Sequence, residues 1–259
     1  MDNDRRAMSN FVVIRKDGSS AKPPMGLHPR RRVIVSVRGR KMIEAILFDL
    51  DGLMFDSEPH SLASWEAVLQ ERGVTLDQLT IDSILGLRID ATARTLIDKY
   101  HLPDTVQELS DAKTEYQIAH LDGNVPPMSG LLELLDEIDR RGMRKAIASS
   151  GIRRYVDAVL RVNGLLDRFS VIITGDQVAH GKPAPDVFLA AARALHVEPQ
   201  DCLVLEDAPA GVQAAQAAGM VCIAVPDHRV AQLDLSQADR SMTSLNDVRV
   251  LLPQLITDE

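Results

Sequence analysis

The sequence contains very few cysteines and no long apolar run. Its two cysteines, Cys202 and Cys222, fit neither a disulfide framework nor a metal-binding spacing. Both lie in apolar runs, which is typical of buried cysteines with free thiols. No run approaches the roughly 20 apolar residues that a membrane-spanning helix needs, and none has the form of a signal peptide. These features predict a cytoplasmic protein with no membrane partner.

Basic residues are scarce beyond the first 41 positions. Residues 1–41 contain 11 Lys and Arg against three Asp, a net charge of +8, whereas the remainder of the chain carries −16. We interpret 1–41 as a basic, flexible leader, and a basic arm for an anionic partner is the alternative. Aromatic residues make up only 3% of the chain. An acidic body without a basic and aromatic surface pattern argues against a nucleic-acid partner.

A chain of 259 residues can form one large domain, or a core domain that carries a smaller one. Short apolar runs predict buried strands at 43–48, 145–148, 171–174, 202–205 and 221–225. Helical patterns separate the last four of these runs, at 153–163, 185–195 and 210–218. Strands that alternate with helices predict a parallel sheet covered by helices on both faces.

One part of the chain breaks this alternation. Residues 57–124 hold no clear strand pattern, and helical patterns cover 60–72, 76–85, 91–100 and 105–121. The single tryptophan, Trp65, lies in the first of them. We therefore predict a core formed by 42–56 and 125–259, interrupted by a helical domain of residues 57–124.

Polar side chains directly follow the predicted strands. They are Asp49 and Asp51 after the first, Ser149 and Ser150 after the second, and Glu206 and Asp207 after the fourth; the segment that follows the third contains Lys182 within Gly181-Lys182-Pro183. Ligands of parallel sheets bind at the carboxyl ends of the strands, so we expect these side chains to meet. Carboxylates packed together repel one another unless a cation lies among them, and oxygen ligands suit Mg²⁺. Asp49 and Asp51 also suit a nucleophile paired with a general acid–base.

Each of these groups has an ordinary structural interpretation when it is taken alone. Two aspartates before Gly52 are typical of a solvated turn, the serine pair could cap a helix, and Lys182 could be an exposed loop lysine. The last acidic pair could begin a helix with Pro209 in its first turn. The occurrence of all four groups, in order and each after a strand, favours a shared site.

In this arrangement the sequence resembles the haloacid dehalogenase (HAD) superfamily. The segments that resemble its four motifs are Phe48-Asp49-Leu50-Asp51-Gly52, Ser149, Gly181-Lys182-Pro183 and Glu206-Asp207. Asp56-Ser57-Glu58, 182–188 and 205–211 resemble the branch that contains β-phosphoglucomutase and sugar-phosphate phosphatases. The resemblance covers about 42–255. It implies an α/β fold, with a Rossmann-like parallel-sheet core and a small all-helical cap domain inserted after the first strand.

The resemblance also implies roles for the matching residues. Asp49 is the expected nucleophile, which forms an aspartyl-phosphate, and Asp51 is the expected acid–base. The expected catalytic residues are Asp49, Asp51, Ser149 and Lys182, and the expected Mg²⁺ ligands are Asp49, Asp51, Asp207 and Glu206. The expected substrate ligands are Ser149, Ser150, Lys182 and, from the inserted helices, Arg88, Lys113 and Glu58. A solvated charge on the cap surface is the alternative for Arg88 and for Lys113.

These roles predict an Mg²⁺-dependent phosphatase for a small phosphorylated metabolite, a sugar or polyol phosphate. The alternative is a β-phosphoglucomutase, but Ser61 and Ile89 stand where that branch has its cap histidine and arginine. His60 and Arg88 are each one residue away from those positions. A 2-haloacid dehalogenase, which needs neither Mg²⁺ nor a second acid, and a non-catalytic binding module are more remote alternatives. We expect a monomer, with a dimer as the alternative.

Overall fold

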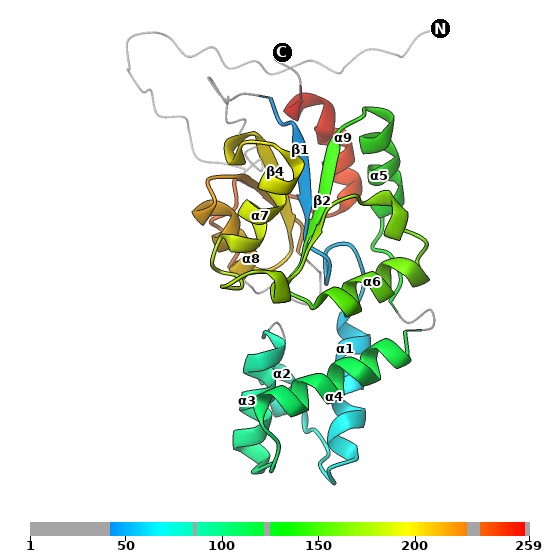
Figure 1. The fold of residues 1–259 in the computed structure, drawn as a ribbon, viewed down its shortest axis with the longest axis vertical. Helices are drawn as coiled ribbons and strands as arrows, with labels where there is room; N and C mark the ends of the chain where they lie inside the picture. The colour runs from blue at the N-terminus through cyan, green and yellow to red at the C-terminus, as the bar shows by residue number, and fades with distance from the viewer. Residues whose placement is uncertain (1–41, 85–86, 122–124, 227–233, 257–259) are drawn as a thin grey trace, which may run out of the picture. The chain divides into compact units, whose positions relative to one another are not determined.

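The computed structural model describes residues 42–84, 87–121, 125–226 and 234–256. The predicted leader, residues 1–41, lies outside the described residues. Within the described chain, six strands form one sheet in the order β3-β2-β1-β4-β5-β6, and every neighbouring pair is parallel (Figure 1). The strands are β1 (Ala45–Phe48), β2 (Arg144–Ala148), β3 (Ile172–Ile173), β4 (Cys202–Glu206), β5 (Val221–Ala224) and β6 (Arg240–Ser241). This sheet confirms the predicted α/β class.

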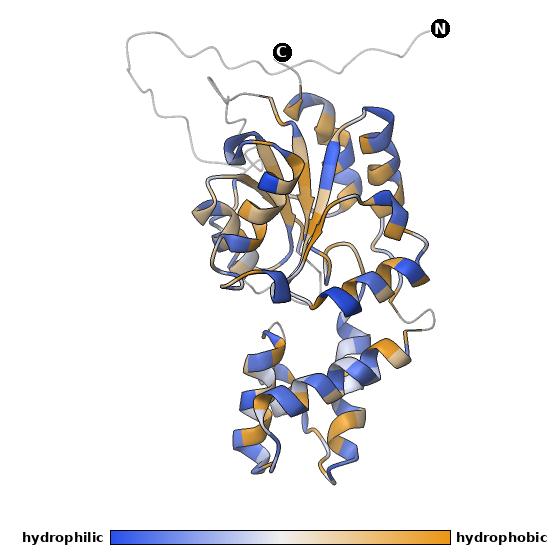
Figure 2. Ribbon diagram, viewed as in Figure 1, coloured by the Kyte–Doolittle hydropathy of each residue, from blue (hydrophilic) through white to orange (hydrophobic). Residues whose placement is uncertain are grey.

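The sheet is buried on both faces because its side chains alternate between two layers of helices. Ile46 and Phe48 of β1 point into one apolar cluster, and Ala45 and Leu47 point into the other. The first cluster contains the apolar faces of α5 (Leu131–Arg140), α6 (Arg153–Val162) and α9 (Leu245–Leu255). The second contains those of α7 (Asp186–Leu195) and α8 (Pro209–Ala217). Figure 2 shows strands that are largely apolar, except at the start of β2, between helices that carry both apolar and hydrophilic residues.

Between β1 and β2 the chain forms helices without any described strand. Those that come before α5 are α1 (Glu58–Gln70), α2 (Gln78–Ile84), α3 (Ile89–Tyr100) and α4 (Val106–Ala119). These four helices form the cap domain, and they share an apolar cluster of their own that includes Trp65, Leu69 and Leu96. A capping box of Thr105 and Glu108 begins α4, because each side chain bonds the backbone N–H of the other residue.

Two α-helices and one strand had no counterpart among the elements expected from the sequence. The helix α5 follows the cap directly, and α9 contains Pro253 near its end. The strand β6 has two residues, so it offers no periodic pattern to recognise.

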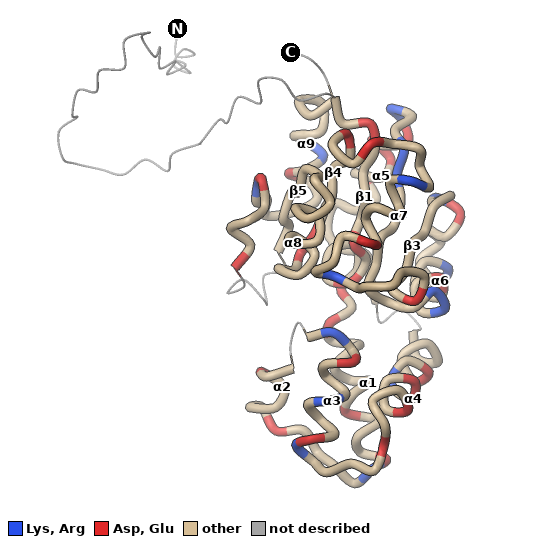
Figure 3. The backbone as a smooth tube through the Cα atoms, turned by 60° about the vertical axis from the view of Figure 1, so that its left-hand side comes forward, with Lys and Arg blue, Asp and Glu red and all other residues tan. Residues whose placement is uncertain are grey.

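Asp and Glu are distributed over both the core and the cap helices (Figure 3). Within the described residues, we find no helix with the length and apolar character to cross a membrane.

The strand order places the ends of β1 and β4 side by side at the centre of the sheet. After β1 the chain moves to one side, to β2 and β3, and after β4 it moves to the other, to β5 and β6. The crevice between such strands is where open parallel sheets bind ligands. Asp49 and Asp51 follow β1, and Glu206 and Asp207 lie at the end of β4. The topology therefore brings together two acidic pairs that are far apart in the sequence.

The central strand gives a direct test of this architecture. Leu47 is fully buried in β1, whereas Leu79 on α2 is 80% exposed. Leu47→Ala should lower the free energy of unfolding by about 2–5 kcal/mol, because it removes buried methyl groups and leaves a cavity. The same change at Leu79 should stay within about 0.5 kcal/mol of the parent protein. Chemical denaturation of both variants measures the difference, and equal losses would contradict the layered core.

Candidate active site

Asp49, the nucleophile predicted from the sequence, lies at the carboxyl end of the central strand β1. The backbone N–H of Asp49 donates to the carbonyl of Leu205 at 3.1 Å, which extends the pairing of β1 with β4 by one residue. The side chain of Asp49 is thereby held at the end of the central strands, and the residue is only 7% exposed. Beyond it the chain turns sharply, with the N–H groups of Met54 and Phe55 both donating to the carbonyl of Leu50.

Gly52 allows this turn to lie against the second acidic pair. Its φ of +79° falls in the left-handed region that favours glycine. A Cβ at this position would lie 2.2 Å from Oδ2 of Asp207. Asp207 can therefore approach the Asp49–Gly52 turn only because this residue lacks a side chain.

Lys182 is the cation at the centre of the acidic groups. Its Nζ donates to Oδ1 of Asp49 and, at 2.6 Å, to Oε1 of Glu206. The ammonium also lies 4.8 Å from the ring centroid of Phe188. Burial by itself opposes a charged lysine, but the carboxylates of Asp49 and Glu206 raise the pKa of Lys182 well above its ordinary value. The lysine therefore stays positively charged and bridges β1 to β4.

Negative charge in the cluster exceeds what one lysine balances. Carboxylate oxygens of Asp49, Glu206 and Asp207 all lie within 4.8 Å of one another. Burial, with a further contribution from Glu206, raises the pKa of Asp49 to about 7, even though Lys182 opposes the rise. Burial and then the charges of Glu206 and Asp49 raise the pKa of Asp207 well above its ordinary value. Such a set of crowded oxygen donors fits a divalent cation.

Glu206 differs from the other two acids because the chain itself satisfies its oxygens. Oε1 accepts from Lys182, and Oε2 accepts from the backbone N–H groups of Asp207 and Ala208 at 3.0 and 3.1 Å. A Cβ on Gly211 of α8 would lie 1.7 Å from Oε1, so glycine is needed there as well. Glu206 thus anchors Lys182 and the start of α8, which leaves Asp49 and Asp207 as the freer oxygen donors.

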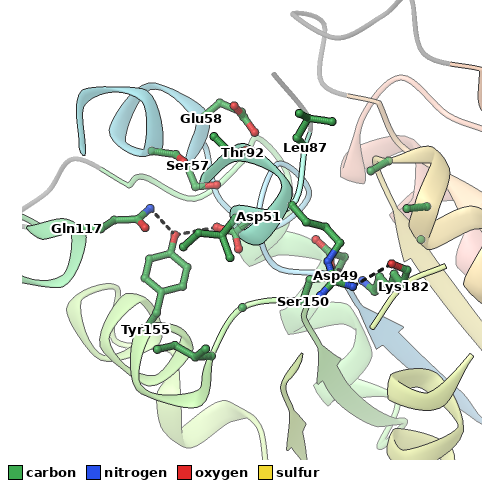
Figure 4. A pocket seen from close by; sticks show the side chains of 18 of the residues that line it. Asp49, Asp51, Ser57, Glu58, Leu87, Thr92, Gln117, Ser150, Tyr155 and Lys182 are labelled. Carbon is green, nitrogen blue, oxygen red and sulfur yellow. Dashed lines mark hydrogen bonds and ion pairs between the residues drawn. The ribbon is translucent and has the colours of Figure 1, made fainter. Parts of the chain in front are cut away.

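A cavity of about 260 Å³ lies over this cluster, with walls from both the core and the cap (Figure 4). Its lining includes Asp49, Asp51, Lys182 and Asp207 from the core. Ser150 also lines the cavity. Among the described residues, Ser149 does not line it: Ser149 is buried, and its hydroxyl accepts from the N–H of Gly151 at 3.0 Å. Each predicted core group therefore lies at this cavity or directly beside it.

The cap contributes polar groups to the opposite wall. Ser57, Glu58 and Ser61 of the first cap segment line the cavity, as do Lys113, Thr114 and Gln117 of α4. The guanidinium of Arg88 donates to the carbonyl of Lys182 at 3.2 Å and forms an ion pair with Asp90. All three cap residues predicted to bind substrate thus line the cavity, and Arg88 in addition contacts the loop that carries the buried lysine.

Lys113 is a buried cation. Its Nζ donates to Oε1 of Gln117 at 2.6 Å and lies 5.7 Å from the ring centroid of Trp65. Burial lowers the pKa of Lys113 to about 8, although the charges of Asp51 and Glu58 oppose the shift. A lysine in this environment costs stability, which is typical of a residue retained for a function at that site.

Tyr155 and Gln117, among the lining residues that sequence reasoning missed, connect Asp51 to the cap. The hydroxyl of Tyr155 on α6 donates to Oδ1 of Asp51 at 2.7 Å, and Nε2 of Gln117 lies 3.3 Å from that hydroxyl. Burial and the charge of Asp51 raise the pKa of Tyr155 well above its ordinary value, so the phenol stays protonated. A tyrosine in the apolar pattern of a helix normally indicates core. The signal that could have found it is that α6 begins directly after the Ser149-Ser150-Gly151 segment.

Comparison with known proteins agrees with this geometry. The family model of haloacid dehalogenase-like hydrolases matches residues 46–225, which is more than half of the chain. The chain belongs to this family. It is 31% identical to validoxylamine A 7′-phosphate phosphatase of Streptomyces hygroscopicus subsp. limoneus over 208 residues, covering 80% of this chain and 97% of that enzyme.

Two further relatives show how far the likeness extends. The chain is 40% identical over 190 residues to protein SUPPRESSOR OF QUENCHING 1, chloroplastic, of Arabidopsis thaliana; the match covers 71% of this chain but 18% of that protein. The crystal structure of CbbY from Rhodobacter sphaeroides in complex with phosphate has a TM-score of 0.73 and 30% identity. It covers 80% of this chain and 96% of that one. These comparisons confirm the family that the motifs predicted.

The close approach of Gly52 and Asp207 gives one prediction. Gly52→Ala should destabilise the protein by about 1–2 kcal/mol more than Gly73→Ala. Both glycines have a left-handed φ, +79° and +73°, but a Cβ at Gly73 would meet nothing within 4 Å. The control therefore carries the backbone strain without the clash. Thermal or chemical unfolding of the two variants measures the difference, and a smaller effect at Gly52 would show that Asp207 moves aside freely.

The buried ammonium of Lys113 gives a second prediction, which concerns the dependence of stability on pH. Because its folded pKa of about 8 lies below the ordinary 10.5, the unfolded chain binds more protons between these values. Lys113→Met should therefore stabilise the protein at pH 7 by about 1–3 kcal/mol, and the gain should fall as the pH rises from 8 toward 10.5. Lys99→Met, at a half-exposed lysine of the same cap, should give no such gain. Unfolding curves at several pH values test this, and a gain that does not change with pH would refute it.

Proposed function

We propose that the protein is an Mg²⁺-dependent phosphatase that hydrolyses a small phosphorylated metabolite, a sugar or polyol phosphate, through an aspartyl-phosphate on Asp49. One observation carries the proposal: the buried carboxylate of Asp49 is held by Lys182 beside Asp207, at the floor of a cavity that also contains Asp51. A nucleophile, a buried cation and a second carboxylate at one point are the parts that phosphoryl transfer through a covalent intermediate requires.

The proposed reaction has two steps. An oxygen of Asp49 attacks phosphorus, the bond from phosphorus to the leaving oxygen breaks, and Asp51 gives that oxygen a proton. Asp51 then takes a proton from water, which attacks phosphorus and releases phosphate and free Asp49. Lys182 and the backbone near Ser149 and Ser150 hold the phosphoryl oxygens during both steps.

Mg²⁺ fits the donor set, with Asp49, Asp207 and the backbone carbonyl of Asp51 as the proposed ligands and Glu206 beside them. When bound, the ion supplies positive charge that offsets the negative charge of the phosphoryl oxygens and of the crowded acids. In the protein alone, burial raises the pKa of Asp49 and so opposes its ionisation. Additional positive charge beside Asp49 favours the carboxylate form, which is the form that attacks phosphorus.

The walls of the cavity support a polyhydroxylated leaving group. Ser61 and Thr92 bring hydroxyls to the cap wall, and Gln117 and Lys113 bring an amide and an ammonium, whereas the Thr114 hydroxyl donates to the carbonyl of Ser110. These polar groups can bind the hydroxyls of a sugar or polyol, and the apolar part of the wall, which includes Trp65, can pack against its carbon skeleton. A likeness to a phosphatase named for validoxylamine A 7′-phosphate supports the same class.

The cap geometry favours hydrolysis over phosphoryl return to the sugar. At the two positions that distinguish the mutase branch, Ser61 and Ile89 line the cavity. The neighbouring His60 is buried and its Nε2 lies 2.8 Å from the carbonyl of Gln117, so it joins α1 to α4. A short serine hydroxyl is poorly suited to the histidine's role, and isoleucine cannot bind a second phosphate.

Phosphate release from a panel of sugar and polyol phosphates tests the function. We expect turnover that vanishes in EDTA and returns with Mg²⁺. Asp49→Asn should lower turnover by several orders of magnitude, because no other group can form the covalent intermediate. The matched control is Asp82→Asn on the exposed face of α2, which should retain parental turnover. Residual activity of more than a few per cent in Asp49→Asn, or full activity in chelator, would overturn the proposal.

The same assay separates phosphatase from mutase. With β-glucose 1-phosphate and a trace of the 1,6-bisphosphate, free phosphate should appear in step with substrate loss. Glucose 6-phosphate that accumulates faster than phosphate would move the chain to the mutase branch.

A further inference from the structure

A chain of hydrogen bonds connects the cap to Asp51. Nζ of Lys113 donates to Oε1 of Gln117 at 2.6 Å, and Nε2 of Gln117 lies 3.3 Å from the hydroxyl of Tyr155. That hydroxyl donates to Oδ1 of Asp51 at 2.7 Å (Figure 4). Lys113 and Gln117 belong to α4 of the cap, whereas Tyr155 belongs to α6 of the core. This network of hydrogen bonds therefore connects the cap to the core.

The ammonium group of Lys113 fixes the direction of each hydrogen bond in this network. An ammonium group can only donate, so Gln117 must present its carbonyl oxygen to Lys113 and its NH₂ group to Tyr155. The hydroxyl of Tyr155 then accepts from Gln117, and its single proton is directed to Asp51. The amide orientation of Gln117 and the direction of the phenol proton are thus set by the network.

The surroundings of Tyr155 separate this arrangement from ordinary core packing. Tyr155 lines the cavity beside Asp51, and Lys113, Gln117 and Tyr155 are all at least nine-tenths buried. Among the described residues, the Tyr155 hydroxyl is the group that donates a hydrogen bond to the Asp51 carboxylate. It occupies Oδ1, which leaves Oδ2 as the oxygen that can carry a proton to the leaving group.

We propose that Tyr155 is a positioning residue that holds the Asp51 carboxylate, and that Gln117 links this hold to the cap. The inference rests on the proposed function in one respect, the role of Asp51 as the acid–base. Tyr155 does not touch the reacting atoms. It acts by fixing which oxygen of Asp51 faces the leaving group, so its loss impairs proton transfer and not the attack of Asp49.

The leaving group provides a readout that packing alone does not change. When an oxygen of Asp49 bonds to phosphorus, the bond to the leaving oxygen breaks, and that oxygen departs either as an alcohol or as an anion. A benzyl alkoxide is strongly basic and needs the proton of Asp51, whereas 4-nitrophenolate is stable without it. Benzyl phosphate and 4-nitrophenyl phosphate are similar in size, so they form a matched pair of probes.

The experiment measures the first turnover of each probe by rapid quench in the full-length, Mg²⁺-loaded protein. For Tyr155→Phe, we expect the first turnover of benzyl phosphate to fall about 10- to 100-fold and that of 4-nitrophenyl phosphate to stay within about twofold. Tyr116→Phe removes the same hydroxyl from a tyrosine of α4 that is not among the described lining residues, and it should change neither rate. Asp51→Asn should show the same selectivity as Tyr155→Phe, with a larger loss.

A second variant tests the link to the cap. Gln117→Leu should lower the benzyl-to-nitrophenyl rate ratio by a smaller factor than Tyr155→Phe. In the Tyr155→Phe background it should lower that ratio no further, because its effect on Asp51 passes through the hydroxyl.

Each other outcome has a definite meaning. Equal losses for both probes in Tyr155→Phe, or no loss for either, would overturn the positioning role while the proposed function stands. A further drop of the ratio on adding Gln117→Leu would overturn the link to the cap. A parent protein that releases no phosphate from these probes or from the panel of sugar and polyol phosphates, or an Asp51→Asn variant without leaving-group selectivity, would instead overturn the proposed function itself.

Discussion

The site depends on the electrostatic balance between one buried lysine and the acids that surround it. Lys182 binds Asp49 and Glu206 at once, and the two acids come from neighbouring strands of the sheet. Charges this deeply buried are costly unless they are paired and hydrogen-bonded. Glu206 meets that condition within the chain, whereas Asp49 and Asp207 keep pKa values well above the ordinary range. The fold therefore crowds carboxyl groups that resist ionisation when no further positive charge lies beside them.

In the cap, one set of residues holds the helices together and another set lines the cavity. Trp65, Leu69 and Leu96 belong to the apolar cluster that holds its helices together. The side of α4 that faces the cavity is polar, and Lys113 there has a pKa lowered to about 8 by burial. An aliphatic side chain would pack at that position without a charge to desolvate. The buried ammonium therefore lies in the cavity wall at a cost in stability, as charged groups at functional sites often do.

Two contacts between cap and core lie at the reacting groups. Arg88 donates to the carbonyl of Lys182, and Gln117 reaches Asp51 through Tyr155. One contact therefore touches the loop of the lysine that holds the proposed nucleophile, and the other touches the proposed acid–base. Because both contacts come from the cap, the geometry of both groups depends on the position of the cap.

Local sequence determined which residues form most of the core site. A run such as Ile46–Phe48 must be buried, and polar residues directly after it must lie at the strand's carboxyl end, so Asp49 and Asp51 could be placed from the sequence. The same holds for Lys182 and for Glu206 and Asp207, since each lies in or beside a segment that follows a strand. The sequence also indicated a helical insertion, because 57–124 carries only helical periodicity.

The tertiary structure alone decided which of these residues touch and how they divide the work. Only the strand order places β1 against β4, so that one lysine binds both acids and a Cβ at Gly52 would meet Asp207. It also decided that the Ser149 hydroxyl accepts from the N–H of Gly151 while Ser150 lines the cavity, and that Tyr155 binds Asp51. A residue type and its spacing fix the face of an element on which a side chain lies. The partner it meets depends on contacts between segments about a hundred residues apart, and no local pattern records them.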